Sequence, residues 1–414
     1  MNLNESTRIA IIGAGASGIF TAIQIKELDP SISVCIYEEG SRPLKKVKIS
    51  GGGRCNVTHH QFDTQVLSEK YPRGHKELRG PFTQFQPLDM VAWLKKHGVD
   101  TKFESDGRIF PVSNSSESII ECFLHEIKKH RILIHYHHPV ENISYSKTNH
   151  EFKIEFNGKN PQSCSHLVLS TGSSKTGHRL AKTLGHKITE LAPSLFTFKV
   201  TDFRLQDLAG ISFQDVGLQL EIQKRKFTER GPLLITHWGL SGPALIRLSA
   251  WAARELQGSQ YQANLKINFF PNYKEDALFN YLLEYKKENA KKKLSKLTFT
   301  KTMSKRYWLQ LLEHLQISSN KLWSELSKKE IHKLIADCNQ ASFRVQGKGI
   351  FKEEFVTCGG ISRKEIDFKT MMSKKQKKLF ATGELLDIDG ITGGFNFQNA
   401  WTSAYLVAHA IQSK

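Results

Sequence analysis

Arg8-Ile9-Ala10-Ile11-Ile12-Gly13-Ala14-Gly15-Ala16-Ser17-Gly18 begins the first predicted βα unit of the chain. The run 8–12 has the length and composition of a strand, and 19–28 has helical spacing with one buried stripe. Proline ends that helix at Asp29-Pro30, and 32–37 predicts a second strand followed by Glu38. Strand, G-x-G-x-x-G, helix, strand and acid in this order predict a dinucleotide-binding unit, the alternative being a βαβ unit that binds nothing.

The glycines and the acid each have a physical role in such a unit. Gly13 permits the tight turn, Gly15 lets backbone approach a pyrophosphate, and Gly18 lets the helix pack closely on its strand. The helix N-terminus, at Ala16-Ser17, offers free N–H groups and positive dipole to phosphate. Glu38 can accept from a ribose hydroxyl and would repel a 2′-phosphate, which indicates FAD or NAD rather than NADP.

A basic, glycine-rich segment follows, Lys46-Val47-Lys48-Ile49-Ser50-Gly51-Gly52-Gly53-Arg54-Cys55-Asn56. It offers bare backbone donors, cations and an amide, which suit a phosphate, a ribityl chain or a flavin ring, and a flexible loop is the alternative. The stretch 49–56, placed after the acid of an N-terminal dinucleotide fold, resembles the BaiN-like flavoproteins. That family is also described as NAD(P)/FAD-dependent oxidoreductases or aminoacetone-oxidase-like FAD-binding enzymes.

A second match to this family lies near the C-terminus. Leu379-Phe380-Ala381-Thr382-Gly383-Glu384 predicts a strand ending in glycine, and Asp387–Asn396 precedes an apolar helix expected over 397–411. Gly393-Gly394 before that helix would direct N–H groups and positive dipole to the pyrimidine end of a flavin and stabilise its anionic reduced form. A simple turn at the start of the helix is the alternative for the glycine pair alone.

The resemblance implies a set of FAD-binding residues from both ends of the chain and from two segments between them. Pro139-Val140 lies where related flavoproteins bring backbone against adenine, and Thr171-Gly172 ends a buried strand, 166–172, of a kind that commonly closes over the cofactor. The chain departs from the family at 173–178, where it runs directly into a helix expected over 179–184. The predicted cofactor-binding residues are Gly13, Gly15, Ala16, Ser17, Gly18, Glu38, Lys46, Gly51, Gly52, Gly53, Arg54, Cys55, Asn56, Val140, Thr171, Gly172, Gly383, Glu384, Asp389, Gly390, Thr392, Gly393, Gly394, Phe395 and Asn396.

The 414-residue length predicts two or three domains. The expected class is α/β, a three-layer Rossmann-like FAD-binding domain with a β-rich and a helical insertion. Alternating runs at 195–200, 217–222, 225–227 and 343–355 support the β-rich part, and basic amphipathic helices over 276–336 support the helical part. The expected bounds are 1–192 and 356–414 for the FAD-binding domain, 193–270 and 340–355 for the β-barrel-like insertion, and 271–339 for the helical subdomain.

His237 is the weak candidate for a catalytic acid or base. It lies in Thr236–Ala244, which resembles a Thr-His…Gly-Ser-Gly-Pro-Ala signature of the family, although a satisfied loop histidine is the commoner interpretation. Ser241 is the expected N-cap of a helix continuing through Leu256. No metal site is predicted, because alternation places only two histidines of the 135–138 cluster on one face and no acid joins them.

The formal charge of +19 would favour anionic partners such as nucleic acid or acidic lipid. Solvated lysine-rich helix faces are the commoner interpretation, and no RNA-binding module or aromatic–basic alternation is recognisable, so no specific nucleic acid partner is expected. No apolar run reaches membrane-spanning length. Six scattered cysteines without C-x-x-C fit a reducing compartment, which predicts a cytoplasmic protein. The sequence makes no prediction of the oligomeric state.

The predicted function is that of an FAD-dependent oxidoreductase acting on a small molecule that the sequence does not identify. The flavin would be reduced by the substrate or by NAD(P)H, and NAD(P)H would bind only transiently because the chain has no second G-x-G-x-x-G. The resemblance implies activities such as amine oxidation by oxygen and NAD(P)H-linked reduction of activated carbon–carbon double bonds. Two alternatives stay open, a nucleic-acid-directed flavoprotein such as a tRNA-modifying one, and a flavin-bound regulator without turnover.

Overall fold

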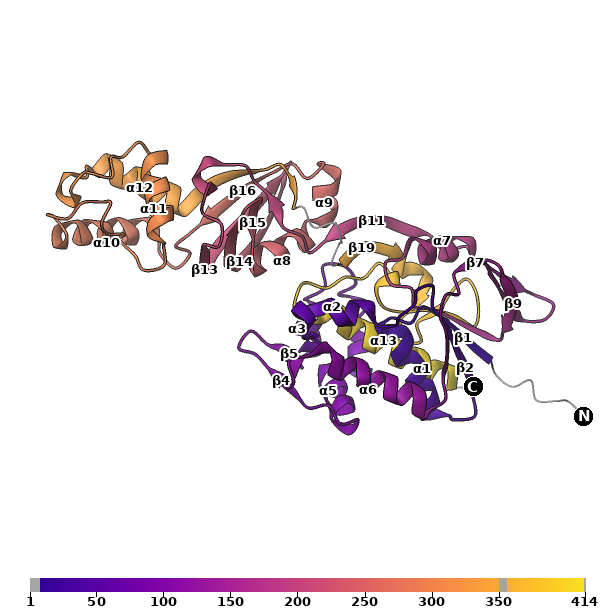
Figure 1. Cartoon of the computed structure of the whole chain (residues 1–414). Helices are drawn as coiled ribbons and strands as arrows, with labels where there is room; N and C mark the ends of the chain where they lie inside the picture. Colours follow the sequence, from indigo (N-terminus) through magenta and orange to yellow (C-terminus); the bar gives the residue numbers. More distant parts are fainter. Residues whose placement is uncertain (1–7, 350–355, 413–414) are drawn as a thin grey trace, which may run out of the picture. The chain divides into compact units, whose positions relative to one another are not determined.

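The computed structural model describes residues 8–349 and 356–412. The parts of the predictions that fall on 1–7, 350–355 and 413–414, including the end of the strand expected over 343–355, lie outside the described residues. The chain divides into two compact units, Met1–Leu191 with Val356–Lys414 and Ala192–Phe355 (Figure 1). The first is called the split unit below, and the second the inserted unit.

The split unit is built on a seven-stranded sheet in the order β20-β21-β22-β10-β1-β2-β6. The five strands from β22 to β6 are parallel, so their carboxyl ends meet at one edge of the sheet. This arrangement confirms the predicted α/β class with a Rossmann-type sheet. The strands are β1 Arg8–Ile12, β2 Ser33–Tyr37, β6 Leu133–His135, β10 His166–Leu169, β20 Ile366–Asp367, β21 Met372–Ser373 and β22 Leu379–Ala381.

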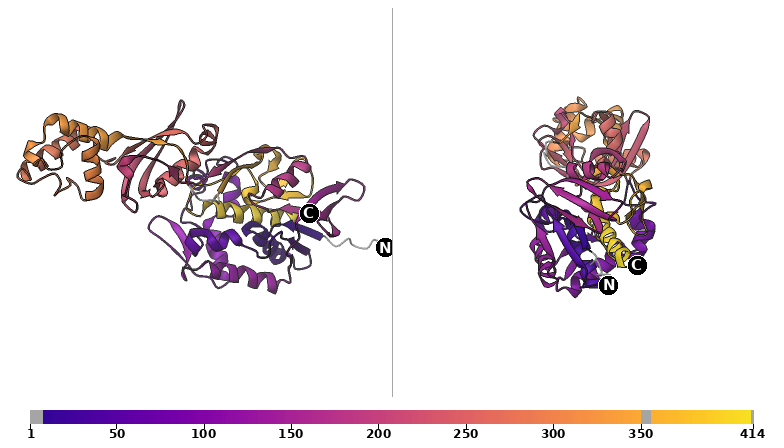
Figure 2. Two further views of the ribbon diagram at one scale, coloured as in Figure 1. Left: turned by 45° about the horizontal axis from the view of Figure 1, so that its top comes forward. Right: turned by 90° about the vertical axis from the view of Figure 1, so that its right-hand side faces the viewer.

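Helix α1 follows β1 directly and is buried along its whole middle, from Ser17 to Ile25. The sequence predicted a single buried stripe. The difference arises because α13, the last helix of the chain, packs along α1 and gives it a second covered side (Figures 1 and 2). The helices of this unit are α1 Ala16–Leu28, α2 Lys45–Gly53, α3 Thr64–Ser68, α4 Arg79–Gln84, α5 Pro87–Lys96, α6 Ser116–Lys129, α7 Lys175–Thr183 and α13 Phe395–Gln412.

Three smaller sheets complete the split unit, with strand orders β3-β5-β4, β7-β8-β9 and β11-β19. In the sheet of β3, β5 and β4, strand β3 is the first strand after the glycine-rich segment 51–53. The strands are β3 Thr58–His59, β4 Thr101–Phe103, β5 Arg108–Pro111, β7 Val140–Ser146, β8 Glu151–Phe156, β9 Lys159–Cys164, β11 Ile188–Ser194 and β19 Val356–Ile361.

In its described residues, the inserted unit has a seven-stranded sheet in the order β17-β16-β13-β14-β15-β12-β18 together with five α-helices and two short 3-10 helices. One hydrophobic core contains residues of both the sheet and the helices, so the helical segment shares its core with the β-rich part. The elements are β12 Phe198–Lys199, β13 Ser212–Ile222, β14 Arg225–Thr236, β15 Gly239–Ser241, β16 Ala263–Asn268, β17 Ala341–Val345, β18 Gly347–Lys348, α8 Pro243–Trp251, α9 Ala253–Gly258, α10 Glu275–Glu288, α11 Lys305–His314 and α12 Lys328–Gln340.

Three local predictions were wrong at their ends. The N-cap of α8 is Gly242 and not Ser241, because Ser241 belongs to β15 and pairs with Leu234. Helix α8 ends at Trp251, so the predicted helix through Leu256 is two helices. Helix α7 begins four residues before the expected Arg179, at Lys175.

Candidate functional site

A cavity of about 100 Å³ lies at the carboxyl edge of the main sheet, where the parallel strands end. Four predicted cofactor-binding residues line it, from four separate segments: Gly13, Glu38, Val140 and Thr171. The sequence analysis missed the other lining residues, which are Ile12, Tyr37, Glu39, His138, Ser174 and Thr176. The parallel register of β1, β2 and β10 was the signal that could have indicated the strand-end members of this set.

The turn after β1 fits closely around its glycines. The Gly13 N–H donates to the Tyr37 carbonyl (2.8 Å), and a Cβ on Gly18 would lie 2.0 Å from the Gly13 carbonyl oxygen. A Cβ on Gly15 would have no neighbour nearer than 4.0 Å, so this glycine faces open space. Gly15 is also the N-cap of α1 and makes no side-chain cap, so no side chain covers the first N–H groups of the helix.

Glu38 holds this turn through both carboxylate oxygens. Oε2 accepts from the Ala14 N–H and Oε1 accepts from the Gly40 N–H, each at 2.8 Å. Glu39 also lines the cavity, although strand alternation would direct the side chains of neighbouring residues such as Glu38 and Glu39 to opposite faces. Alternation does not apply there because β2 ends at Tyr37, one residue before the pair.

The basic segment is a helix running into three left-handed glycines, not a simple loop. Helix α2 keeps helical geometry up to Ile49, after which Gly51, Gly52 and Gly53 have φ of +57°, +69° and +84°. A Cβ on Gly52 or Gly53 would meet no atom within 4 Å, and all three glycines are exposed. Their backbone is therefore open to close approach by a ligand.

Lys46 on α2 links this segment to the C-terminal motif. Its ammonium group donates to a Glu384 carboxylate oxygen (2.6 Å) and to the Ser173 hydroxyl (3.0 Å). The other oxygen of Glu384 accepts from the Thr357 N–H (2.9 Å). Two predicted residues far apart in the chain, Lys46 and Glu384, are thus brought together beside a third, Gly172, which adopts a φ of +57°.

Arg54 and Cys55, which directly follow the glycine segment, anchor its end to the protein through contacts and burial. The Arg54 guanidinium lies 4.0 Å from the centre of the Phe110 ring and pairs with Glu104 (2.6 Å). The Cys55 side chain is fully buried, and burial raises the pKa of its thiol to about 12. Cys55 is therefore neutral at physiological pH and serves packing rather than thiolate chemistry.

Asn56 connects the two glycine motifs directly. In the amide orientation that satisfies both of its groups, the side-chain oxygen accepts from the Gly394 N–H (2.9 Å) and the nitrogen donates to the Thr58 carbonyl (3.0 Å). A Cβ on Gly394 would lie 2.6 Å from Thr58 backbone, so only glycine fits. The Thr58 hydroxyl donates to Gln398 on α13 (2.6 Å), which fixes the start of that helix beside the glycine segment.

The rest of the C-terminal motif is held by internal contacts. Asp389 is completely buried and ion-paired with Arg73, so its carboxylate fixes the loop instead of facing open space. The Asn396 amide exchanges two hydrogen bonds with Gly390, each of 2.9 Å. Phe395 is buried against His59, and Thr392 is half-buried. The φ of +62° at the buried Gly383 turns the chain after β22.

His59 is a site residue that the sequence analysis missed. Its ring stacks on Phe395 at 4.7 Å between centroids, and a Cβ on Gly393 would lie 3.2 Å from it. Its Nδ1 is buried without a hydrogen-bond partner among the described residues. Burial is the main cause of its lowered pKa, so His59 is neutral near pH 7.

The arrangement fits an FAD molecule on three observations. Thr171 lines the cavity, and its buried hydroxyl, which lies against Gly177, has no hydrogen-bond partner among the described residues. The N-terminus of α1 is uncovered, which suits a pyrophosphate. The glycine backbone at 51–53 is free of side chains, which suits a flat ring system. The Gly393-Gly394 pair is joined to this segment by the hydrogen bond between Asn56 and the Gly394 N–H.

His237 lies elsewhere, in the exposed turn between β14 and β15 of the inserted unit. Its proposed acid/base role stays a prediction. Among the described residues, Glu27, Glu126 and His130 are grouped closely enough to ligate a metal ion, but Lys129 already pairs with Glu126 (2.8 Å). No helix in the described part of the chain is both long and apolar enough to cross a membrane.

Comparison with known proteins places these features in a family. The model described as HI0933-like protein Rossmann domain matches residues 7–410. A 3-dehydro-bile acid delta(4,6)-reductase of Clostridium scindens is 28% identical over 97% of this chain and 98% of its own. A ribosomal RNA dihydrouridine synthase of Haemophilus influenzae is 27% identical over 99% of each. The solved 3-ketosteroid delta1-dehydrogenase of Sterolibacterium denitrificans, 11% identical, shares the fold with a TM-score of 0.51 over 98% of this chain and 99% of that one.

Proposed function

The chain belongs to the HI0933-like Rossmann family and is an FAD-dependent oxidoreductase, and we propose that it reduces a carbon–carbon double bond conjugated to a carbonyl group. The observation that carries the proposal is that two relatives with different substrates have names describing one kind of reaction. A delta(4,6)-reductase saturates double bonds of a 3-oxo compound, and dihydrouridine is uridine with two hydrogens added. Both relatives match nearly the whole chain.

Bound FAD would supply the hydride chemistry, and NAD(P)H is the proposed source of the two electrons. The residues of the chain bind and orient the cofactor. The proposed contacts are the N-terminus of α1 with the pyrophosphate, the Thr171 hydroxyl and Val140 at the adenosine end, and the backbone of 51–53 and 393–394 at the ring. Saturation of the double bond needs one hydride and one proton; His59 is a titratable group beside the C-terminal glycines, and because its pKa is lowered it would have to take up a proton before it could supply one.

The test is an anaerobic titration of the yellow, FAD-containing protein. NADH or NADPH is expected to bleach the flavin absorption, and a conjugated enone is expected to restore it, whereas the matching saturated ketone should not. Bleaching by an amine without a nicotinamide would replace the proposal with an amine oxidase. Bleaching by neither class, with FAD firmly bound, would favour the regulator without turnover.

A second candidate is reduction of a uridine base in RNA. The specific observations are the formal charge of +19 and the full-length similarity to ribosomal RNA dihydrouridine synthases of two organisms, at 27% and 28% identity. The same conjugated double bond occurs in uracil, so the site chemistry need not differ. Dihydrouridine formation in RNA incubated with the protein and NADPH, and no enone turnover, would select this candidate.

A further inference from the structure

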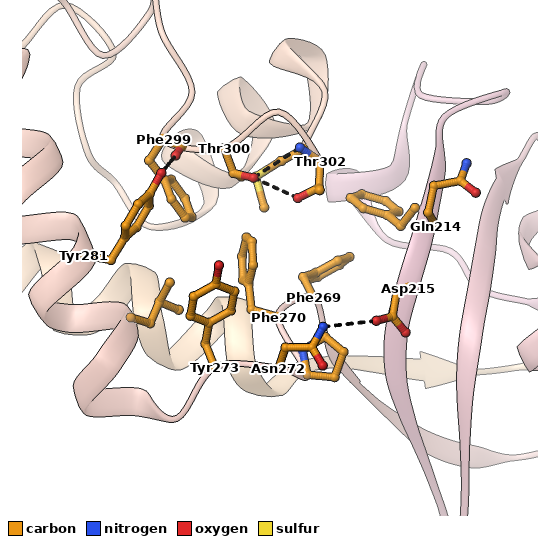
Figure 3. Close-up of a pocket in the computed structure, with 14 residues that line it drawn as sticks. Gln214, Asp215, Phe269, Phe270, Asn272, Tyr273, Tyr281, Phe299, Thr300 and Thr302 are labelled. Carbon is orange, nitrogen blue, oxygen red and sulfur yellow. Dashed lines mark hydrogen bonds between the residues drawn. The ribbon is translucent and has the colours of Figure 1, made fainter.

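A second pocket, of about 180 Å³, is lined entirely by residues of the inserted unit, and none of them is among the residues that line the cavity of the split unit (Figure 3). It is formed where the start of β13, the loop 269–273 after β16, helix α10 and the loop 299–303 before α11 come together. Ligand pockets for drug-sized molecules usually enclose roughly 300–1,000 Å³. The smaller volume here suits a single ring system and excludes a whole steroid.

Aromatic rings form the walls of this pocket. Phe270 packs against Phe299 at 5.3 Å between centroids, and Phe213 packs against Phe269 at 4.7 Å. Tyr273 and Tyr281 also line the pocket (Figure 3), and about half of each residue is exposed to solvent. The Tyr281 hydroxyl is used, since it donates to the Phe299 carbonyl (2.8 Å), whereas the Tyr273 side chain is 50% exposed and makes no hydrogen bond to the described residues. An exposed aromatic face beside an apolar recess is a surface for stacking a planar ring.

One edge of the pocket is polar. The bulge in β13 releases Gln214 and Asp215 from the strand ladder, and both residues line the pocket. Asp215 is held by Arg230 (2.8 and 2.6 Å) and receives a longer contact from Asn272 (3.5 Å). The Gln214 amide is exposed and has no hydrogen bond to any described residue. Amide and carboxylate groups beside stacked rings can read the donors and acceptors on the edge of a heteroaromatic base.

The segment 286–306, which contributes the loop 299–303 to the pocket, is strongly basic in sequence, although no basic side chain is among the residues that line the pocket. Lys301 lies between two lining residues, Thr300 and Thr302, is exposed, and forms no salt bridge with the described residues. The acids near the opening, Glu275 and Asp276, begin α10 on the other side of Tyr273 in the chain. Residues 286–306 contain one acid, Glu288, and nine basic side chains: Lys286, Lys287, Lys291, Lys292, Lys293, Lys296, Lys301, Lys305 and Arg306.

We propose that this pocket binds an unstacked base of single-stranded RNA, with Tyr273 stacking on the base and Lys301 and its basic neighbours holding the adjacent phosphates. Aromatic stacking with a basic track is the usual means by which proteins hold single strands. The choice of RNA as the polymer rests on the second candidate function. The binding itself does not depend on flavin chemistry, and the pocket can hold RNA whichever molecule is reduced.

The test measures binding of a fluorescein-labelled, unstructured oligoribonucleotide to the FAD-containing protein by anisotropy, without any reductant. Tyr273→Ala is expected to weaken binding by roughly ten- to a hundredfold, because a stacked base is worth about 1–3 kcal/mol. Tyr273→Phe should retain wild-type affinity. Affinity falls as salt rises, and Lys301→Ala should make this dependence shallower. The slope of log affinity against log salt should decrease in magnitude by about 0.7, the value for one phosphate contact on a single strand.

The matched control is Phe203→Ala, because Phe203 is also 50% exposed and lies in the same unit but outside the pocket. It should bind RNA like the wild type. Equal losses in Tyr273→Ala and Phe203→Ala, or unchanged binding in both, would overturn the proposal. So would binding of a free mononucleotide as tight as that of the oligomer, since that would mark a nucleotide site without a polymer. Because no turnover is measured, failure of the reductase proposal would leave this result untouched.

Discussion

Gly18→Ala is expected to yield protein without FAD. The added Cβ would lie 2.0 Å from the Gly13 carbonyl oxygen, a contact with backbone that no side-chain rotation can relieve. Either α1 must move away from β1 or the turn proposed to bind the pyrophosphate must open. Overpacking costs about 1–3 kcal/mol even where neighbours can adjust, so we expect a loss near 3 kcal/mol in the free energy of unfolding. Flavin absorption of the purified variant and urea unfolding measure the two effects.

Gly15→Ala is the matched control, three residues earlier in the same turn. Its Cβ would have 4.0 Å of clearance and its φ lies outside the left-handed region, so the fold should keep wild-type stability. FAD affinity should nevertheless fall, because the methyl group would occupy the space through which backbone approaches the pyrophosphate. A Gly15→Ala protein with full FAD affinity would refute the placement of the pyrophosphate at this turn. A stable, yellow Gly18→Ala protein would refute the packing role of Gly18.

Local patterns determined how much of the fold could be predicted. The last helix was predicted over 397–411 and extends from Phe395 to Gln412, because its apolar composition is a local signal. Strand β14 was predicted only as 225–227 although it extends to Thr236. Its second half contains Gly231 and Pro232, which read as a break, and it is strand because β13 and β15 pair with it on either side.

The cofactor site was partly predictable for the same reason. The glycine motifs are contiguous and therefore visible in the sequence. The partners of those motifs are not, since the pairing of Asn56 with Gly394 and of Lys46 with Glu384 joins segments more than three hundred residues apart. His59 was missed because nothing in its own neighbourhood marks it, and only the return of α13 places it beside Gly393. The pocket of the inserted unit is lined from four separate segments and carries no contiguous motif.

Glu38→Ala is expected to weaken FAD binding by roughly ten- to a hundredfold, because hydrogen bonds to a charged group are worth about 1.5–3 kcal/mol. The sequence alone suggested one reason, acceptance from the adenosine ribose. The structure adds another, since the carboxylate accepts from the N–H groups of Ala14 and Gly40 and so shapes the turn at the phosphate site. Loss of the side chain removes both the ribose acceptor and this brace.

Glu38→Gln separates the two reasons. From the ribose contact alone we would expect a mild effect, because an amide oxygen can still accept. The structure predicts a substantial loss, because each carboxylate oxygen faces an N–H donor and an amide would place its NH₂ group against one of them. A buried donor facing another donor costs about 1–3 kcal/mol. FAD titration into the apoprotein distinguishes the outcomes, and near-wild-type affinity in Glu38→Gln would show that the brace contributes little.

The control for this series has to be chosen from the structure. Glu39 is unsuitable, because it lines the cavity beside Glu38 and its removal would change the charge at the cavity proposed for the adenosine end. Glu121 on α6 is an exposed glutamate that does not line the cavity, and Glu121→Ala should leave FAD affinity unchanged. If Glu39→Ala lowers affinity while Glu38→Ala does not, the ribose contact belongs to Glu39 and the Glu38 carboxylate serves the turn alone.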